Sequence, residues 1–242
     1  MADSMEEQFK KVREETKDLP FEIPLESDTE KKSRREELMR NVKMFVDNDD
    51  TEGLVSFVER FAHFDSLTNV LNRAGFSAEA QPLLERIATL PKGFDQRTGE
   101  YVSFNVLFLD ADRFKAINDT FGGHAAGDAA LQHFAETIRR GLRRDDIVGR
   151  YGGEEFVVAF ICSSKQSLVL RNRFIVAEKV RAALENAPFT YSGKTVPLTA
   201  SIGVAQLQPG EDDLDQIIRR ADKAMYRAKE AGRNRVVVAE EP

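Results

Sequence analysis

The sequence predicts an α+β fold in which helices flank a central, mainly antiparallel sheet. Long amphipathic stretches alternate with short, almost wholly apolar runs, which are typical of buried strands. Gly152 and Gly153 lie between two of these runs, Ile147–Tyr151 and Phe156–Ile161. Adjacent glycines between strands indicate a two-residue hairpin, because both central positions then need positive φ. The predicted order of elements is β-α-α-β-β-α-(ββ)-β-α-β, with an antiparallel pair at its centre.

Composition limits the class of protein. The 242 residues, 41% of them hydrophobic, suffice for one large domain or for one domain with an extension. The net charge of −6 disfavours broad nucleic-acid binding, whereas a nucleotide needs only a local group of cations. No apolar run approaches the roughly 20 residues of a membrane span, and the N-terminus lacks the layout of a secretory signal. We therefore expect a soluble, cytoplasmic protein that binds neither nucleic acid nor membranes. A single cysteine, Cys162, excludes an internal disulfide and is expected in the core.

Residues 1–60 are expected to form an N-terminal helical extension of unknown function, and residues 61–242 the main domain. Residues 1–30 mix charges with few apolar positions and predict a mobile or loosely docked arm. Two apolar stripes follow, within Glu30–Val46 and Leu54–Ala62, and each predicts an amphipathic helix. These helices would pack either on the main domain or on a second copy of the chain, and the sequence leaves both open.

The first half of the main domain is expected to end a buried strand in acidic residues. The polar stretch Asp65–Arg73 predicts a tight turn before a helix, and residues 91–99 predict an exposed loop. The apolar run Phe104–Leu109 predicts a strand covered on both faces. Asp110 and Asp112 then emerge at its C-terminal end, where open sheets often place ligand sites.

The second half is expected to add helices and one small hairpin. The predicted elements are a helix at Arg113–Asp119, a glycine-rich link at Phe121–Asp128, a helix with apolar positions from Leu131 to Leu142, a helix at Ser167–Asn186, a hairpin turn at Ser192–Gly193, a strand at Thr199–Ala205, a helix at Leu214–Ala231 and a strand at Arg235–Ala239. Gly232 suits the left-handed position that follows a helix.

Acidic residues stand at two predicted strand ends. Asp110 follows the buried strand, and Glu154 follows the Gly-Gly turn. Neighbouring strands would bring both carboxylates to one metal ion. Mg²⁺ takes one or two carboxylates and completes its shell with waters and phosphate oxygens. The alternative is an ordinary turn with solvated glutamates.

Other polar residues suit a nucleotide. Lys229 and Arg233 lie four residues apart around the end of the last helix and would form a polyphosphate clamp; alternatively, they only complement the helix C-terminus. Asn118 and Asp128 supply an amide and a carboxylate, the pair that reads guanine, although both residue types also cap helices.

Five motifs in register now make the chain recognisable. They are Asp-Ser-Leu-Thr-Asn-Val-Leu-Asn-Arg at 65–73, Asp-Ala-Asp-Arg-Phe-Lys-Ala-Ile-Asn-Asp at 110–119, Arg-Tyr-Gly-Gly-Glu-Glu-Phe at 150–156, Ser-Ile-Gly-Val at 201–204 and Ala-Asp-Lys-Ala-Met-Tyr-Arg-Ala-Lys-Glu-Ala-Gly-Arg-Asn at 221–234. Together they resemble the GGDEF family of diguanylate cyclases, with the Gly-Gly-Glu-Glu-Phe variant of its name motif. The resemblance covers about residues 60–240.

The resemblance implies a nucleotidyl-cyclase fold related to polymerase palms. It also implies a reaction that joins two GTP molecules into cyclic di-GMP and two pyrophosphates. Asp110, the Ala111 carbonyl and Glu154 would hold Mg²⁺, or Mn²⁺ in its place, and Glu154 would also help to deprotonate the attacking 3′-hydroxyl. The triphosphate would be held by backbone amides near Arg113 and Phe114, with Lys115, Lys229 and Arg233.

The resemblance further implies that Asn118 and Asp128 read guanine. Gly152 and Gly153 would let the ribose and α-phosphate lie on the turn. Each protomer would bind one GTP, so that the reaction takes place only in a two-fold homodimer.

Arg143 and Asp146 match the family's Arg-x-x-Asp product-inhibition site, where cyclic di-GMP would bind as an inhibitor. On the residues alone, this segment is equally a solvated charged turn.

Three departures from the family pattern stand out. One glycine is added at 122–123, which would either bulge harmlessly or displace Asp128 from guanine. The loop at 91–102 is long, and Lys179 occupies a position that often carries arginine, so that product inhibition would be weaker. The alternative function is a catalytically silent module that senses GTP or cyclic di-GMP. Such modules typically lose the metal-binding acids or the glycines, all of which are present here.

Overall fold

The computed structural model describes residues 28–48, 50–90, 94–96, 98–121, 123–164, 169–208 and 213–240. The chain divides into two compact units, one up to Phe64 and one from Asp65 onward. Most of the predicted N-terminal arm, residues 1–30, lies outside the described residues. None of the described helices is long and apolar enough to cross a membrane.

The first unit contains the two predicted amphipathic helices, α2 (Asp28–Asp47) and α3 (Thr51–His63). Asp50 caps α3, because its side chain accepts a hydrogen bond from the Gly53 amide at 2.9 Å. The ring of Phe57 lies 5.6 Å from that of Phe45 and 5.7 Å from that of Phe61, centroid to centroid. The contact between Phe45 and Phe57 therefore joins the two helices through their apolar faces.

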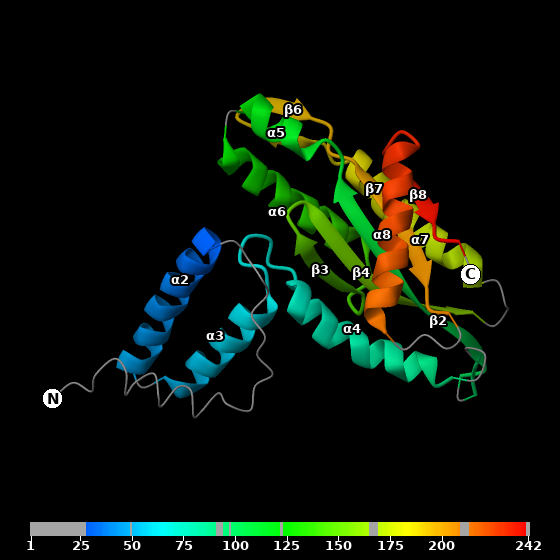
Figure 1. Cartoon of the computed structure of the whole chain (residues 1–242), viewed down its shortest axis with the longest axis horizontal. Helices are drawn as coiled ribbons and strands as arrows, with labels where there is room; N and C mark the ends of the chain where they lie inside the picture. The colour runs from blue at the N-terminus through cyan, green and yellow to red at the C-terminus, as the bar shows by residue number, and fades with distance from the viewer. Residues whose placement is uncertain are drawn as a thin grey trace. The chain divides into compact units, whose positions relative to one another are not determined.

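The second unit is one sheet with helices on both faces (Figure 1). Its strands are β1 (Phe94–Asp95), β2 (Glu100–Ala111), β3 (Ile147–Gly152), β4 (Glu155–Ser164), β7 (Ala200–Gln206) and β8 (Arg235–Val238). Its helices are α4 (Arg73–Ala88), α5 (Phe114–Phe121), α6 (His124–Gly141), α7 (Val169–Glu185) and α8 (Leu214–Glu230). A separate hairpin, β5 (Phe189–Tyr191) and β6 (Lys194–Val196), turns at Ser192–Gly193 as predicted.

The strand order is β3-β4-β2-β7-β8, with β1 pairing beside β2. Strand β2 is antiparallel to both of its long neighbours, β4 and β7, while β7 and β8 run parallel. This arrangement confirms the predicted α+β, palm-like fold with a mainly antiparallel sheet. In the register, Asp110 lies opposite Glu155 of β4 and Ser201 of β7. The C-terminal end of β2 thus meets both neighbours at one edge.

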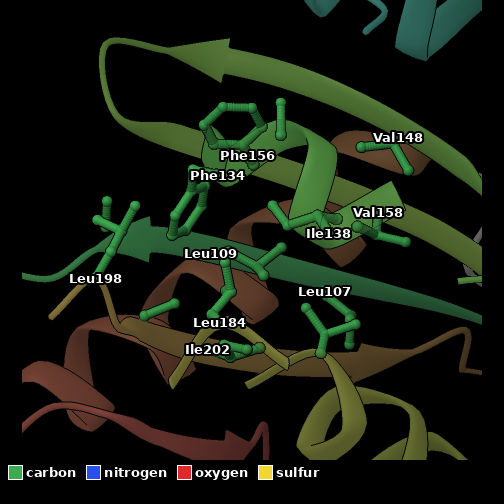
Figure 2. Packing of buried hydrophobic residues seen from close by; sticks show 14 of the residues in the cluster. Leu107, Leu109, Phe134, Ile138, Val148, Phe156, Val158, Leu184, Leu198 and Ile202 are labelled. Atoms are coloured by element: carbon green, nitrogen blue, oxygen red, sulfur yellow. The ribbon is translucent and has the colours of Figure 1, made fainter. Parts of the chain in front are cut away.

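Strand β2 is buried on both faces, as its unbroken apolar run predicts. Leu107 and Leu109 face the side covered by α6 and α7, where they join a cluster with Phe134 and Phe156 (Figure 2). Phe104 and its alternating neighbours face the side covered by α4 and α8. Burial of both faces fixes the register, because a slip by one residue would exchange the two apolar sets.

Gly203 determines how closely α8 approaches the sheet. A Cβ at this position would lie 1.9 Å from the carbonyl oxygen of Ala221 in α8, so only glycine allows the helix backbone to rest on β7. Buried residues of α8, from Leu214 to Ala228, face the sheet and confirm the predicted apolar stripe. This packing brings the last turn of α8 to the end of β2, where Lys229 contacts Asp110.

The structure corrects three boundaries. Gly152 is the last residue of β3, and the turn consists of Gly153 and Glu154, one position later than predicted. The register shifts between Arg150 and Gly152, so an irregularity in β3 uses up one residue before the turn. Positive φ is needed at Gly153, where it is 35°.

The other two corrections concern connections. Phe94 and Asp95 form β1 and pair with the start of β2, where a loop was expected. Helix α6 begins at His124, so Gly127 and Asp128 belong to the helix and not to the glycine-rich link.

Candidate active site

The candidate site lies where the end of β2, the β3–β4 turn and the end of α8 meet. Asp110 ends the buried apolar run of β2 and is itself 5% exposed. Lys229, in the last turn of α8, places its Nζ 2.6 Å from Asp110 Oδ2. Burial raises the pKa of Asp110, and the Lys229 ammonium opposes that shift, as does the charge of Arg233. The acid at the end of β2 therefore lies near two cations from the end of α8 and the loop after it, which are far away in the sequence.

Glu154 lies in the turn beside the same strand end. Its carbonyl oxygen accepts the Ala111 amide at 3.3 Å, which ties the turn to β2. Burial raises the pKa of Glu154, and so does the negative charge of Asp110. Glu155, opposite Asp110 in the register, shows the same pattern, with burial first and then Asp110 raising its pKa. The three carboxylates thus repel one another.

The repulsion among these carboxylates shows that the site suits a divalent cation, because a bound cation would relieve it. A cation bound between Asp110 and Glu154 would favour the charged form of both carboxylates, against the burial that raises both pKa values and the charge of Asp110 that raises the pKa of Glu154. Two carboxylates are also the number of acidic protein ligands that Mg²⁺ commonly takes beside phosphates. No cluster of three or more His, Cys, Asp or Glu is placed to hold a metal among the residues that the structure describes. The residues present fit a cation completed by a nucleotide.

The segment after Asp112 carries the residues proposed for the triphosphate. Arg113 is exposed and has a positive φ of 55°, and it precedes the N-terminus of α5. The first amides of a helix have no intrahelical partner and suit an anion. The side chain of Phe114 is buried, so this residue offers its backbone, whereas Lys115 is exposed.

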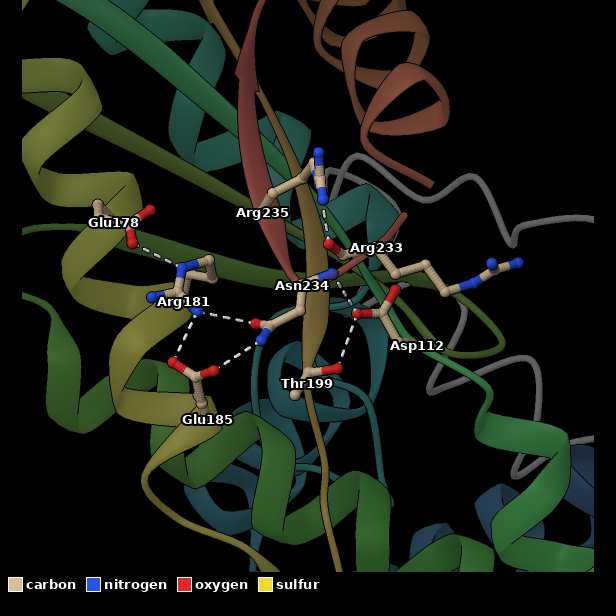
Figure 3. Close-up of polar contacts among 8 residues, drawn as sticks. All are labelled: Asp112, Glu178, Arg181, Glu185, Thr199, Arg233, Asn234 and Arg235. Atoms are coloured by element: carbon tan, nitrogen blue, oxygen red, sulfur yellow. Dashed lines mark hydrogen bonds and ion pairs between the residues drawn. The ribbon is translucent and has the colours of Figure 1, made fainter. Parts of the chain in front are cut away.

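Arg233 lies in the loop between α8 and β8, and this loop is anchored by a hydrogen bond to Asp112. Asp112 accepts hydrogen bonds from Thr199 Oγ1 at 2.8 Å and from the Asn234 amide at 2.9 Å (Figure 3). It also accepts one from Ser201 Oγ at 2.6 Å. The second acid of the Asp-x-Asp pattern is therefore structural. The different roles of Asp110 and Asp112 could not be predicted from the sequence, because both acids follow the same apolar run.

Asn118 and Asp128, the predicted guanine readers, come from α5 and α6. A Cβ on Gly127 would lie 2.3 Å from Asn118 Oδ1, so the amide of Asn118 packs directly on the residue before Asp128. Asn118 Oδ1 is buried and has no hydrogen-bond partner among the residues that the structure describes. Asp128 is exposed. The added glycine affects the link just before α6, but Gly122 lies outside the described residues.

Arg143 and Asp146 lie in the link between α6 and β3. The Arg143 amide donates to Asp146 Oδ2 at 2.8 Å, and the Arg143 side chain is exposed. Burial raises the pKa of Asp146, while Arg143 and the more distant Lys179 of α7 oppose that shift. The structure thus places Lys179 within electrostatic range of this pair.

A further contact, which the sequence did not indicate, joins the turn at Asp65 to the glycine turn. Arg150 Nη1 lies 3.1 Å from both carboxylate oxygens of Asp65, and Arg150 Nε donates to the Gly153 carbonyl at 2.9 Å. Both residues lie in motifs quoted above, but their separation of 85 positions hides the pairing.

Comparison with known proteins agrees with this geometry. The family model described as "Diguanylate cyclase, GGDEF domain" matches residues 62–235. The protein named diguanylate cyclase A from Treponema denticola is 37% identical over 157 residues, which are 65% of this chain and 40% of that protein. The chain therefore spans about two fifths of the length of this relative.

Solved structures give the same result. The GGDEF domain of YfiN (TpbB) from Pseudomonas aeruginosa is 34% identical with a TM-score of 0.61, and the match covers 72% of this chain and 99% of that one. The coiled coil and GGDEF domain of DgcB from Caulobacter crescentus, in complex with cyclic di-GMP, is 28% identical with a TM-score of 0.63, covering 83% and 97% of the two chains. The chain belongs to the GGDEF domain family of diguanylate cyclases.

Proposed function

We propose that the chain is a diguanylate cyclase that condenses two GTP molecules into cyclic di-GMP and two pyrophosphates across a homodimer. The observation that carries the proposal is the meeting of Asp110 and Glu154 with Lys229 and Arg233 at one sheet edge. Acids that repel one another, with the ammonium of Lys229 and the charge of Arg233 close by, suit a metal-bound triphosphate better than they suit a structural role.

Asp110, the Ala111 carbonyl and Glu154 would hold the divalent cation, Mg²⁺ or Mn²⁺. When bound, the cation would neutralise charge that develops on the α-phosphate. Lys229 would then leave Asp110 for the triphosphate, because the cation replaces it as the partner of that carboxylate. Glu154, whose pKa is raised by burial and by Asp110, is suited to accept the proton of the 3′-hydroxyl.

The remaining substrate contacts would follow the family pattern. The phosphates would lie against the α5 N-terminus at Arg113 and Phe114, with Lys115 and Arg233 beside them. The Gly152–Gly153 segment would accept the ribose, since neither residue has a Cβ. Asn118 and Asp128 would read guanine. Asn118 Oδ1, which is buried and has no hydrogen-bond partner in the described part of the chain, supports this role because guanine offers donors to it.

A homodimer is needed because each protomer would hold one GTP. The 3′-oxygen of one nucleotide attacks the α-phosphorus of the other, forms one phosphodiester and releases pyrophosphate, and the two-fold related step closes the ring. Arg143 and Asp146 would bind the product and slow the enzyme. The binding of cyclic di-GMP by the Caulobacter relative supports this part of the proposal.

The test is to incubate the purified chain with Mg²⁺ and GTP, ATP or both, and to separate the products by chromatography. We expect cyclic di-GMP from GTP alone, with a specific activity that falls on dilution. Glu154→Gln should abolish the product and keep part of the GTP binding, whereas Glu136→Gln, an exposed control on α6, should leave the rate unchanged.

The alternative is a silent module that binds GTP or cyclic di-GMP. Product-free binding of GTP at every protein concentration would favour it. Adenine-containing products would instead show that the added glycine at 122–123 has changed base selection.

A further inference from the structure

The loop after α8 has an unusual backbone. Gly232, Arg233 and Asn234 have consecutive positive φ values of 114°, 66° and 42°. Glycine adopts such angles freely, but residues with a Cβ keep them only where surrounding contacts hold them. Something must therefore hold Arg233 and Asn234 in this conformation.

Asn234 is held from two sides. Its backbone amide donates to Asp112 Oδ2 at 2.9 Å. Its side-chain oxygen accepts from Arg181 Nη1 at 2.8 Å, and its side-chain nitrogen donates to Glu185 Oε1 at 2.8 Å. Both ends of the amide are thus used, and Asn234 bridges β2, through Asp112, to α7 (Figure 3).

The anchors of this bridge are themselves fixed. Asp112 is buried and also accepts from Thr199 and Ser201 of the β7 segment. Arg181 is 13% exposed and pairs with Glu178 at 2.7 Å and with Glu185 at 2.9 Å. A residue tied to a strand end and to a helix in this way has little freedom to move.

The backbone of Arg233 is held by its own hydrogen bonds as well as by its bonded neighbour Asn234. Its amide donates to the Ala228 carbonyl at 3.0 Å, and its own carbonyl accepts from Arg235 Nε at 3.0 Å. Figure 3 shows the Arg233 side chain pointing away from the α7 network, on the far side of Asn234. With the backbone fixed on both sides, only side-chain rotations remain for the guanidinium.

We propose that Asn234 is a positioning residue: by joining Asp112 to the Arg181–Glu185 pair of α7, it presets the left-handed loop that aims Arg233 at the triphosphate. The inference rests on the proposed role of Arg233 in GTP binding. It assigns a function in substrate affinity to side chains of α7 that do not contact the acids of the site.

The chemistry of asparagine fits this position. Asparagine tolerates the left-handed region better than most residues, and its amide supplies one acceptor for Arg181 and one donor for Glu185. Aspartate would lose the donor and add charge between Asp112 and Glu185. Glycine would keep the backbone angle but break the link to α7, so Asn234→Gly separates the two contributions.

The experiment measures binding of 3′-deoxy-GTP, which lacks the nucleophile, and of 3′-deoxyguanosine by calorimetry with Mg²⁺. Asn234→Gly should weaken 3′-deoxy-GTP about tenfold, the size of one lost charge-assisted contact, and leave the nucleoside unchanged. Its KM for GTP should rise more than its kcat falls. Glu136→Gln, which removes one end of an exposed ion pair on α6 outside this bridge, is the matched control and should change neither affinity.

A double-mutant cycle decides whether Asn234 acts through Arg233. In an Arg233→Ala background, Asn234→Gly should cause no further loss of 3′-deoxy-GTP affinity. Additive losses, or equal losses for nucleotide and nucleoside, would overturn the inference and leave the proposed function intact. If Arg233→Ala alone leaves nucleotide affinity unchanged, the assignment of Arg233 in the proposed function is wrong, and the inference falls with it.

Discussion

Lys229 Nζ lies 2.6 Å from Asp110 Oδ2, so the carboxylate proposed as a metal ligand already has a cationic partner. Asp110 is buried, and loss of the ammonium would leave its charge uncompensated. We predict that Lys229→Ala lowers the free energy of unfolding by about 1–3 kcal/mol in the absence of divalent cations. Urea denaturation in EDTA measures this change.

The effect should depend on pH and on metal. Burial raises the pKa of Asp110, and removal of Lys229 raises it further, so the native state then binds the proton more tightly than the unfolded chain. The destabilisation is therefore present at neutral pH and disappears as pH falls through the raised pKa. Mg²⁺ should restore more stability to Lys229→Ala than to the wild type. Equal gains would show that the cation does not take the place of Lys229.

The pair of Arg150 and Asp65 supports the glycine turn. Asp65 also accepts from the amide and the hydroxyl of Thr68, at 2.9 Å and 2.6 Å, so its carboxylate organises the turn that follows α3. We predict that Arg150→Ala costs about 1–3 kcal/mol of stability and lowers the rate, since Arg150 also holds the Gly153 carbonyl.

A matched control is available for this pair. Arg140 and Glu136 form an exposed ion pair on α6, with side chains 73% and 60% exposed. Arg140→Ala should change stability by less than about 0.5 kcal/mol. Equal effects of the two substitutions in thermal unfolding would mean that the Asp65 contact contributes no more than a surface pair.

Gly127 gives a prediction about base recognition. A methyl group here would meet Asn118 Oδ1 at 2.3 Å, so Gly127→Ala must displace the amide proposed to read guanine. We expect a higher KM for GTP and less discrimination against ATP. Gly141→Ala in the same helix meets only ordinary contacts from 3.6 Å and should leave both unchanged. A normal KM for Gly127→Ala would count against Asn118 as a base reader.

Most elements of the fold could be predicted, because the spacing of the apolar residues and the length of each run indicated one type of element. The doubly buried strand β2 and the stripe of α8 are examples: α8 lies close to its expected bounds, whereas β2 contains the expected run Phe104–Leu109 but extends from Glu100 to Ala111. The glycine turn was misplaced by one residue, because the irregularity between Arg150 and Gly152 depends on pairing with β4 and leaves no local pattern.

The candidate site, like the fold, could be predicted only in part from the sequence. Asp110 and Asp112 look alike in sequence, two acids after one strand. Only the tertiary structure gives Asp112 its three neutral donors and gives Asp110 a single lysine. The partners of Asn234 come from α7, about 50 residues earlier in the chain, and a local motif cannot indicate them.

Cys162 should be chemically silent in the folded protein. Burial raises the pKa of its thiol to about 11. At pH 8 the thiolate, which is the reactive form, would then be on the order of one molecule in a thousand. We predict negligible labelling by Ellman's reagent until denaturant is added, with full labelling afterwards. Fast labelling of the native protein would show that the C-terminal end of β4 opens readily.

Product inhibition provides the last prediction. Arg143 is exposed, and its amide, not its side chain, holds Asp146, so truncating the side chain should leave the local turn intact. We expect Arg143→Ala to relieve inhibition by cyclic di-GMP without lowering the initial rate, whereas the exposed neighbour Arg144→Ala should behave as wild type. Lys179→Arg should tighten inhibition, because a guanidinium offers the paired donors that an ammonium lacks. Progress curves with added product measure all three variants. An unchanged inhibition constant in Arg143→Ala would remove this pair from the inhibitory site.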